Sequence, residues 1–359
     1  MRDVLVALCG LTPQVVTETL WALARRTPPV YPAEVWIVTT KAGLRICERR
    51  LFGRRGALAR YRRDHRSTTQ PLRYGPDHVL VLKGANGKPL EDVRSDSDNQ
   101  AVADQLADFL RQHTACEQTR VHCSLAGGRK TMGVLLAGAL QLFGRAEDRL
   151  YHVLVPSTIE QQPDFFYPDP RARRRSMQIE LADIPYVRLR GLLPDAPRGG
   201  SRFTELVAHA EHELRALTNP DILRIDRTGS PHPRIMIGDN PVTMRPDAAR
   251  LYTAFARIKK EHCVKPELRA CDHCTACFVP ISGQKWDQTK GSLQPLAGIG
   301  TLPESVEPVR SLISKMNQAL AKALQSPRVA QCYAIRSVGE RHEKRYGLAA
   351  NKTAIQVEP

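Results

Sequence analysis

The sequence predicts an α/β protein that begins with a Rossmann-like, mostly parallel sheet and continues into a smaller α+β domain. In the first half, short apolar runs alternate with stretches of helical periodicity. The runs are apolar throughout, which is typical of parallel strands covered by helices on both faces. We expect strands at residues 4–9, 34–39, 78–82, 120–123 and 150–155, helices at 14–25, 43–61, 99–112 and 130–143, and shorter edge strands within 179–189.

The domain organisation follows from the length and from a change in composition. A chain of 359 residues accommodates two domains of ordinary size. Residues 191–201 are polar and rich in proline and glycine, so we expect them to link a domain at 1–190 to a second at 202–359. The second contains expected helices at 203–217, 246–262 and 305–324, and strands at 234–237, 332–336, 346–348 and 353–357. Helix, helix and two-stranded hairpin is the order of a winged helix, here with a cysteine-rich insertion around 263–300.

The charge balance indicates an acidic partner, since the net charge is +16 and the isoelectric point is near 9.7. Residues 41–66 contain only two acids but ten basic residues, namely Lys41, Arg45, Arg49, Arg50, Arg54, Arg55, Arg60, Arg62, Arg63 and Arg66. A second cluster comprises Arg171, Arg173, Arg174 and Arg175. Two interpretations stay open: a solvated basic face, or a collar that attracts a polyanion such as nucleic acid.

The chain lacks the signals of a membrane or secreted protein. No run of 18 apolar residues is present, so we expect no transmembrane helix. The apolar run at the start is too short for a signal peptide and passes directly into a turn and a helix. Nine cysteines, an odd number without a small secreted framework, indicate a reducing, cytoplasmic setting.

The stretch Ser-Leu-Ala-Gly-Gly-Arg-Lys-Thr at 124–131 lies at an expected strand-to-helix turn. Its two glycines let the backbone approach a ligand closely. Arg129 and Lys130 add fixed cations at a helix start, where free N–H groups already favour anions. The spacing matches neither a Walker loop nor the G-x-G-x-x-G dinucleotide fingerprint. The stretch therefore predicts a phosphate site of another kind.

Three turns should converge on that site, because ligands of parallel α/β sheets bind outside the carboxyl ends of the strands. These turns are residues 10–14, residues 39–43 and the stretch at 124–131. Asp98 and Asn99, at an expected helix start, are candidates for a cap or for a ligand contact, and capping is the favoured interpretation.

Two motifs together carry a family resemblance. The run C-G-L-T-P-Q-V-V-T-E-T-L-W-A-L at 9–23, paired with S-L-A-G-G-R-K-T-M at 124–132, resembles CARF proteins, the CRISPR-associated Rossmann-fold sensors of cyclic oligoadenylates in type III systems. The likeness is closest to the ring nuclease branch, in which a winged helix follows the sensor. It covers residues 1–190 well and the C-terminal part more loosely, through 314–324 and 345–348. The resemblance implies a homodimer that holds the cyclic ligand in a two-fold-related pocket.

The resemblance also implies which residues make the site. Arg129, Lys130 and backbone N–H groups of the glycine turn would contact phosphates, while Thr12 and Gln14 would contact ribose or base edges. The full set of expected ligand-binding residues is Gly10, Leu11, Thr12, Pro13, Gln14, Thr39, Asn99, Ser124, Ala126, Gly127, Gly128, Arg129, Lys130 and Thr131.

The first functional hypothesis is slow, metal-independent cleavage of the ring, with no catalytic cofactor. The ribose 2′-OH attacks the adjacent phosphate and leaves a 2′,3′-cyclic phosphate end, so the protein need only align the hydroxyl and stabilise charge. Lys130 and Arg129 are the candidates for charge stabilisation, and Thr12, Gln14 and Ser124 for orienting the hydroxyl. No histidine lies inside either motif, and His122 and His152 are expected to be satisfied core histidines.

The second hypothesis is a non-enzymatic sensor whose ligand regulates DNA binding by the winged helix. The expected recognition helix is 311–324, with Lys315, Asn317, Gln318 and Lys322 on it. A winged helix used only for dimerisation is the alternative, and the sensor and nuclease hypotheses do not exclude each other.

A cysteine cluster in the second half matches a metal-binding spacing. Cys271, Cys274 and Cys277 form C-x2-C-x2-C, with Cys263 eight residues before them, and four sulfurs can make a tetrahedral structural zinc site. Reduced cysteines in an inserted segment are the alternative. The residues after Cys277 lack the further cysteine that a ferredoxin-like run requires, which argues against an iron–sulfur cluster.

Overall fold

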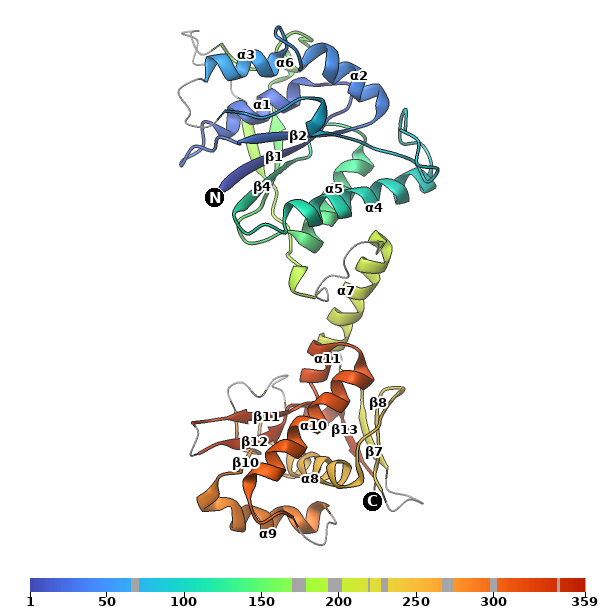
Figure 1. The fold of residues 1–359 in the computed structure, drawn as a ribbon, viewed down its shortest axis with the longest axis vertical. Helices are drawn as coiled ribbons and strands as arrows, with labels where there is room; N and C mark the ends of the chain where they lie inside the picture. The colour runs from blue at the N-terminus through green and yellow to red at the C-terminus, as the bar shows by residue number, and fades with distance from the viewer. Residues whose placement is uncertain are drawn as a thin grey trace. The chain divides into compact units, whose positions relative to one another are not determined.

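The computed structural model describes residues 1–65, 71–169, 179–192, 202–218, 220–226, 232–266, 271, 274–297, 302–340 and 343–358 (Figure 1). The chain divides into two compact units, Met1–Ala210 and Glu211–Pro359. Of the expected linker at 191–201, residues 193–201 lie outside the described part of the chain.

The N-terminal unit is built on a six-stranded sheet in the order β3-β2-β1-β4-β5-β6. The strands are β1 (Arg2–Leu8), β2 (Glu34–Thr39), β3 (Val79–Val81), β4 (Thr119–Ser124), β5 (Arg149–Leu154) and β6 (Glu180–Asp183). Neighbours from β3 to β5 are parallel, and β6 runs antiparallel to β5 at the edge. The α/β class and the mostly parallel sheet expected from the sequence are confirmed.

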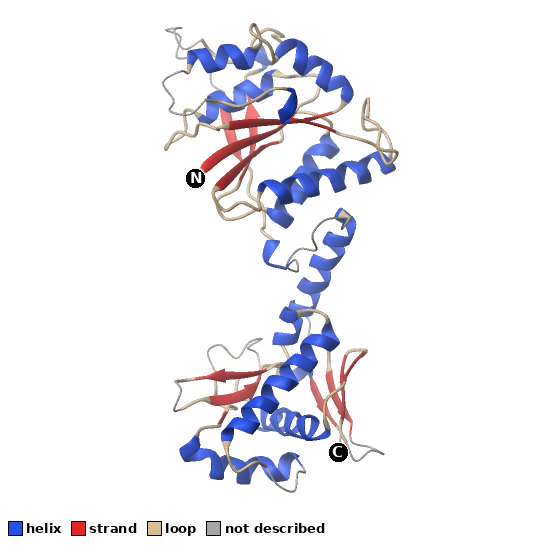
Figure 2. Ribbon diagram, viewed as in Figure 1, coloured by secondary structure: helices blue, strands red, loops and turns tan. Residues whose placement is uncertain are grey.

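Helices cover both faces of this sheet (Figure 2), which explains why its strands are apolar throughout. On one face, Leu5 and Ala7 of β1 pack with α1 (Gln14–Leu23), α2 (Lys41–Arg50) and α3 (Ala57–Asp64). On the other face, Val4, Val6 and Leu8 pack with α4 (Asp96–His113), α5 (Lys130–Phe143) and the first turns of α7 (Phe203–Thr218).

The helix expected at 43–61 is wrong in one respect, because the structure divides it into α2 and α3. Gly53 in the intervening turn has a φ of +78°, which favours glycine. A Cβ at Gly56 would stand 2.2 Å from the Phe52 carbonyl oxygen, so the chain turns tightly there. The residue pattern predicts a continuous helix, because periodicity does not reveal these two backbone constraints.

In its described residues, the C-terminal unit contains two small sheets and the helices α8 to α11, which share one apolar core. One sheet has the order β13-β7-β8-β9, with β7 (Leu223–Asp226), β8 (Arg234–Ile237), β9 (Asn240–Val242) and β13 (Ile355–Val357). The other has the order β10-β12-β11, with β10 (Val279–Pro280), β11 (Ile335–Val338) and β12 (Arg345–Leu348). The helices are α8 (Pro246–His262), α9 (Trp286–Ala297), α10 (Val306–Leu324) and α11 (Pro327–Gln331).

Helices α8 and α10 and strand β8 are confirmed, whereas β7 and α9 were not expected. Strand β7 is short, and α9 contains Gly291 and Pro295, which weaken a helical pattern in the sequence. The remaining elements are the short helix α6 (Ser157–Glu160) and the 3-10 turns Pro76–His78, Arg190–Leu192, Gly283–Lys285 and Lys352–Ala354.

Candidate ligand-binding site

The site lies at the point in the sheet where the order of the strands reverses. Strands β1 and β4 are neighbours, and the sheet extends from β1 through β2 and from β4 through β5. The turns that follow β1 and β4 therefore leave from the switch point of the sheet, where open α/β sheets bind ligands. The two turns touch, since a Cβ at Gly10 would lie 3.0 Å from both the N and the Cα of Gly128.

Each glycine of the Gly-Gly pair has its own structural reason. A Cβ on Gly127 would stand 2.3 Å from the carbonyl oxygen of Leu8 at the end of β1, so a side chain cannot fit without moving the backbone. Gly128 has a φ of +78°, in the left-handed region that other residues rarely adopt. The pair thus lets the chain cross the end of β1 and turn directly into α5.

A cavity of about 590 Å³, called here the loop cavity, opens at this point. Its walls are Cys9, Gly10, Leu11 and Thr12 after β1, Thr40 and Ala42 after β2, Glu91, Asp92 and Arg94 before α4, and Ala126, Gly127, Gly128, Arg129 and Met132 around the start of α5. The expected convergence of three turns is confirmed. The segment at 91–94 is a fourth contributor that sequence reasoning missed, because no local pattern there indicates a ligand.

Two cations stand at the start of α5: Arg129, which lines the loop cavity, and Lys130, which is not among the residues that line it. Arg129 is the residue before the helix and has an extended backbone. Its Nε donates to Asp92 Oδ1 at 2.9 Å, and its Nη2 donates to Asp92 Oδ2. These hydrogen bonds hold the pKa of the Asp92 carboxyl well below its usual range. Lys130 and Thr131 are exposed, and Lys130 has no ion pair within the described residues.

Other expected ligand-binding residues lie off the loop cavity. Ser124 is buried, with its hydroxyl 3.1 Å from that of Thr19 on α1. Thr39 is also buried and donates to the Cys9 carbonyl at 2.6 Å, so its neighbour Thr40 faces the cavity instead. Pro13 is buried before α1, and Asn99 on α4 is not among the residues that line the cavity.

The capping interpretation of the α4 start is confirmed for Asp98. Ser95 is the N-cap and accepts a hydrogen bond from the Asp98 N–H, while the Asp98 carboxylate accepts from the Ser95 N–H at 3.1 Å. This reciprocal arrangement is a capping box.

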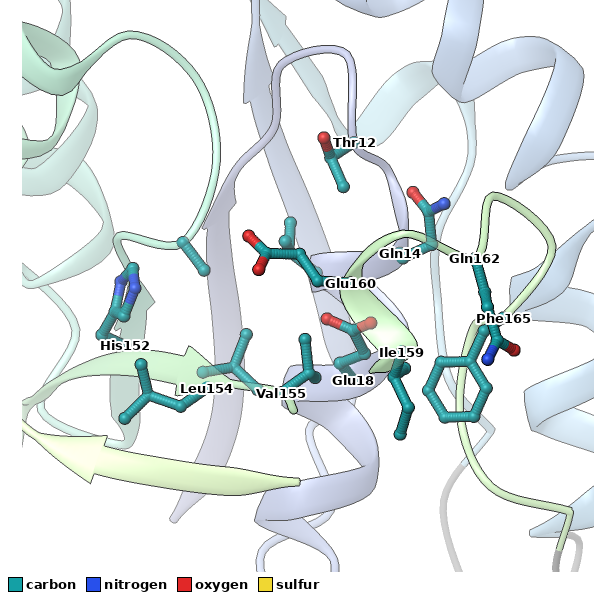
Figure 3. Close-up of a pocket in the computed structure, with 13 residues that line it drawn as sticks. Thr12, Gln14, Glu18, His152, Leu154, Val155, Ile159, Glu160, Gln162 and Phe165 are labelled. Atoms are coloured by element: carbon teal, nitrogen blue, oxygen red, sulfur yellow. The ribbon is translucent and has the colours of Figure 1, made fainter. Parts of the chain in front are cut away.

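A second cavity, of about 250 Å³, adjoins the first through Thr12 and Ala126, which line both. We call it the Glu18 pocket (Figure 3). Its polar groups come from Thr12, Gln14 and Glu18 around the start of α1, from His152 on β5, and from Glu160 and Gln162 at the end of α6 and just after it. Burial, together with the smaller effect of the nearby Glu160 carboxylate, raises the pKa of Glu18 to about 7.

Sequence reasoning missed Glu18, although a signal was present. Nine consecutive residues of α1, from Val15 to Leu23, are buried, and Glu18 is the single carboxylate among them. An acid inside an otherwise uncharged, buried helix is costly to bury unless it serves a purpose.

The two strand histidines differ. His122 is buried as expected, with Nε2 2.9 Å from Asp3 Oδ1 and its ring stacked on Tyr151. His152 is only half-buried and lines the Glu18 pocket, so the expectation of a core histidine is wrong for it.

The cysteine cluster lies far along the chain from this site. Lys259 Nζ stands 2.7 Å from Cys271 Sγ, and both residues are buried. Among the residues that the structure describes, no three His, Cys, Asp or Glu side chains gather closely enough to hold a metal ion. His273 lies outside those residues, and the structural zinc at Cys263, Cys271, Cys274 and Cys277 stays a prediction.

The basic segments are only partly accounted for. Lys41 and Arg45 pair with Glu91 at the rim of the loop cavity, and Arg50 pairs with Asp164. Arg66 and the second cluster at 171–175 lie outside the described residues. In the ranges that are described, no helix combines the length and the apolar character needed to cross a bilayer.

The fold and the glycine turn define an α/β protein with a cavity at the switch point of its sheet. Residues 12–214 match the family described as CRISPR-associated protein NE0113, which is more than half of the chain. The chain therefore belongs to this family of CRISPR-associated proteins. No curated protein matches it.

Proposed function

We propose that this chain binds a cyclic oligoadenylate in the loop cavity and cleaves it slowly without a metal ion. The observation that carries the proposal is the convergence of both motifs on one cavity at the N-terminus of α5, where free N–H groups, two glycines and Arg129 suit phosphate, with Lys130 next along the chain. CRISPR association comes from the family, and the ligand class comes from the resemblance of both motifs to CARF sensors.

In this proposal the protein supplies positioning and charge. Lys130 and Arg129 stabilise the negative charge that develops on the phosphate under attack, and Thr12, at the junction of the two cavities, orients the ribose. Ser124 is unsuited to orienting a hydroxyl, because its own side chain is buried against Thr19. A homodimer would place two loop cavities around one ring.

The test is incubation with labelled rings of three, four and six adenylates in a chelator. We expect one ring to bind and to yield linear products with 2′,3′-cyclic phosphate ends. Lys130→Ala should reduce cleavage roughly a hundredfold or more. Lys88→Ala, which removes an exposed lysine outside both motifs, is the matched control. Tight binding with intact ring after long incubation would remove the nuclease and leave a sensor.

A second candidate, ligand-regulated DNA binding, is favoured by the topology of the C-terminal unit. The order α8, β10, α9, α10, β11, β12, with β10 pairing along β12, supports a winged helix with α10 as its recognition helix. Lys315, Gln318 and Lys322 are exposed on α10. Asn317 is unsuited to reading bases, since its amide exchanges hydrogen bonds with the Ile335 backbone.

Duplex binding tests this candidate. The doubly substituted Lys315→Ala, Lys322→Ala chain should bind DNA more weakly, with a shallower salt dependence. Ring-dependent duplex binding supports a regulator. Absence of duplex binding at low salt leaves the dimerisation alternative.

A further inference from the structure

Two polar groups of the Glu18 pocket lack partners in the described part of the chain. Glu18 is 5% exposed, yet it has no hydrogen bond or ion pair there. Gln14 donates from Nε2 to the Pro163 carbonyl at 2.7 Å, which fixes its amide, while its Oε1 is buried without a partner. Buried polar groups are normally satisfied, so this pair indicates a binding site for a polar ligand.

The pocket also has apolar surface that suits a flat group. Val15, Ile159 and Phe165 line it, and Figure 3 shows Glu18 and Glu160 on separate elements with their carboxylates at the same hollow. Because Thr12 and Ala126 belong to both cavities, one ligand can extend from the loop cavity into the Glu18 pocket.

We propose that the Glu18 pocket holds the adenine base of the nucleotide whose phosphate lies in the loop cavity, with the Glu18 carboxyl group paired to the amino group and a ring nitrogen of the base and Gln14 Oε1 accepting the second amino hydrogen. This assignment rests on the proposed function and makes Glu18 a specificity-determining residue for the same site.

The protonation state of Glu18 fits this partner. Burial and the Glu160 charge raise its pKa to about 7, so much of the carboxyl is neutral near neutral pH. A neutral carboxyl offers one donor and one acceptor, which is the pattern that an amino group beside a ring nitrogen requires. The other titratable groups that face the pocket are Glu160 from α6 and His152 from β5.

A bound cation is the competing occupant, because ionised carboxylates and Gln14 Oε1 are all acceptors. The apolar surface of Val15, Ile159 and Phe165 disfavours it. Moreover, in the ranges that the structure covers, no set of three His, Cys, Asp or Glu side chains is arranged for a metal ion.

The experiment measures affinity for the adenylate ring that binds, in chelator, from pH 6 to pH 9. Wild-type affinity should fall by up to about tenfold for each pH unit above 7, as the carboxyl ionises. Glu18→Gln keeps a donor and an acceptor, so it should bind the ring without this pH dependence. Glu18→Ala and Gln14→Ala should bind roughly tenfold more weakly or worse at pH 6.

A ring built from purine riboside, which lacks the amino group, should bind the wild type at least about tenfold more weakly than the adenylate ring. Glu117→Gln, an exposed carboxylate outside both cavities, is the matched control and should behave as the wild type. Circular dichroism and the thermal midpoint verify that each variant is folded.

The outcomes separate the two proposals. If Glu18→Ala binds the ring as the wild type does while Lys130→Ala does not, the base assignment is overturned and the proposed function stands. If the wild type binds no ring, the proposed function itself fails. A pH dependence that persists in Glu18→Gln belongs to Glu160 or His152 and overturns the assignment, as does binding that requires added Mg²⁺.

Discussion

Arg129 and Asp92 form a two-pronged ion pair in the wall of the loop cavity, with Arg129 Nε 2.9 Å from Asp92 Oδ1 and Nη2 bonded to Oδ2. Asp92 therefore occupies the guanidinium edge that a phosphate would use in the proposed function. A phosphate that binds here must compete with a carboxylate already in place.

Asp92→Asn tests this competition. The change removes the negative charge but keeps the shape, so affinity for the ring should rise by roughly two- to fivefold at low salt, and less at high salt. Titration of labelled ring measures it. Asp96→Asn, at the exposed start of α4, removes the same charge away from Arg129 and should have little effect. Weaker binding by Asp92→Asn would mean that Asp92 positions Arg129 for the ligand.

Gly127→Ala should destabilise the N-terminal unit. The added Cβ would meet the Leu8 carbonyl at 2.3 Å, and relieving that overlap should cost about 1–3 kcal/mol in the free energy of unfolding. Gly133→Ala is the matched change six residues later in α5, where a Cβ meets nothing within 4 Å. It should stabilise the helix by about 0.5–1 kcal/mol. Equal effects of the two substitutions in denaturant unfolding would contradict the close approach.

Glu18→Gln should stabilise the protein at high pH. The pKa of Glu18 rises from its ordinary value of 4.5 to about 7, so folding must overcome a cost that grows between those pH values and is constant above them. The difference between variant and wild type should be near zero at pH 4 and reach about 3 kcal/mol above pH 7. Unfolding at several pH values measures it, without ligand. A difference independent of pH would mean that Glu18 titrates normally.

Asp3→Asn should instead destabilise the protein near neutral pH. Burial would raise the pKa of Asp3, but the hydrogen bonds from His122 and Arg120 outweigh it and lower the pKa to about 2. Ionised Asp3 therefore stabilises the fold above its ordinary value of 3.8, and that contribution disappears as pH falls toward 2. The variant should be less stable than the wild type by about 2 kcal/mol at pH 6, and the gap should narrow below pH 4. A gap that widens in acid would refute the linkage.

The sequence predicted most of the sheet because parallel strands covered on both faces leave a direct apolar signal. It also placed the glycine turn, because two glycines between an apolar run and a stretch of helical periodicity indicate a tight turn. It misassigned the break between α2 and α3, which depends on backbone conformation at Gly53 and Gly56.

Side-chain direction was the harder part of the site. Ser124 and Thr39 lie in the expected turns, yet both hydroxyls point into the protein, and that depends on tertiary packing. Glu160 and Asp92 reach the cavities from segments with no motif of their own, so only the folded chain brings them there.

The contact between Gly10 and Gly128, together with the Ser124–Thr19 hydrogen bond, has a kinetic consequence. The turns after β1 and β4 contact each other in the absence of ligand, so the site is preorganised. Ligand binding should then cost little backbone conformational entropy. Association should then be limited by encounter and electrostatic steering rather than by loop closure. Substitutions in the turns after β1 and β4 should change the dissociation rate of the ring more than its association rate.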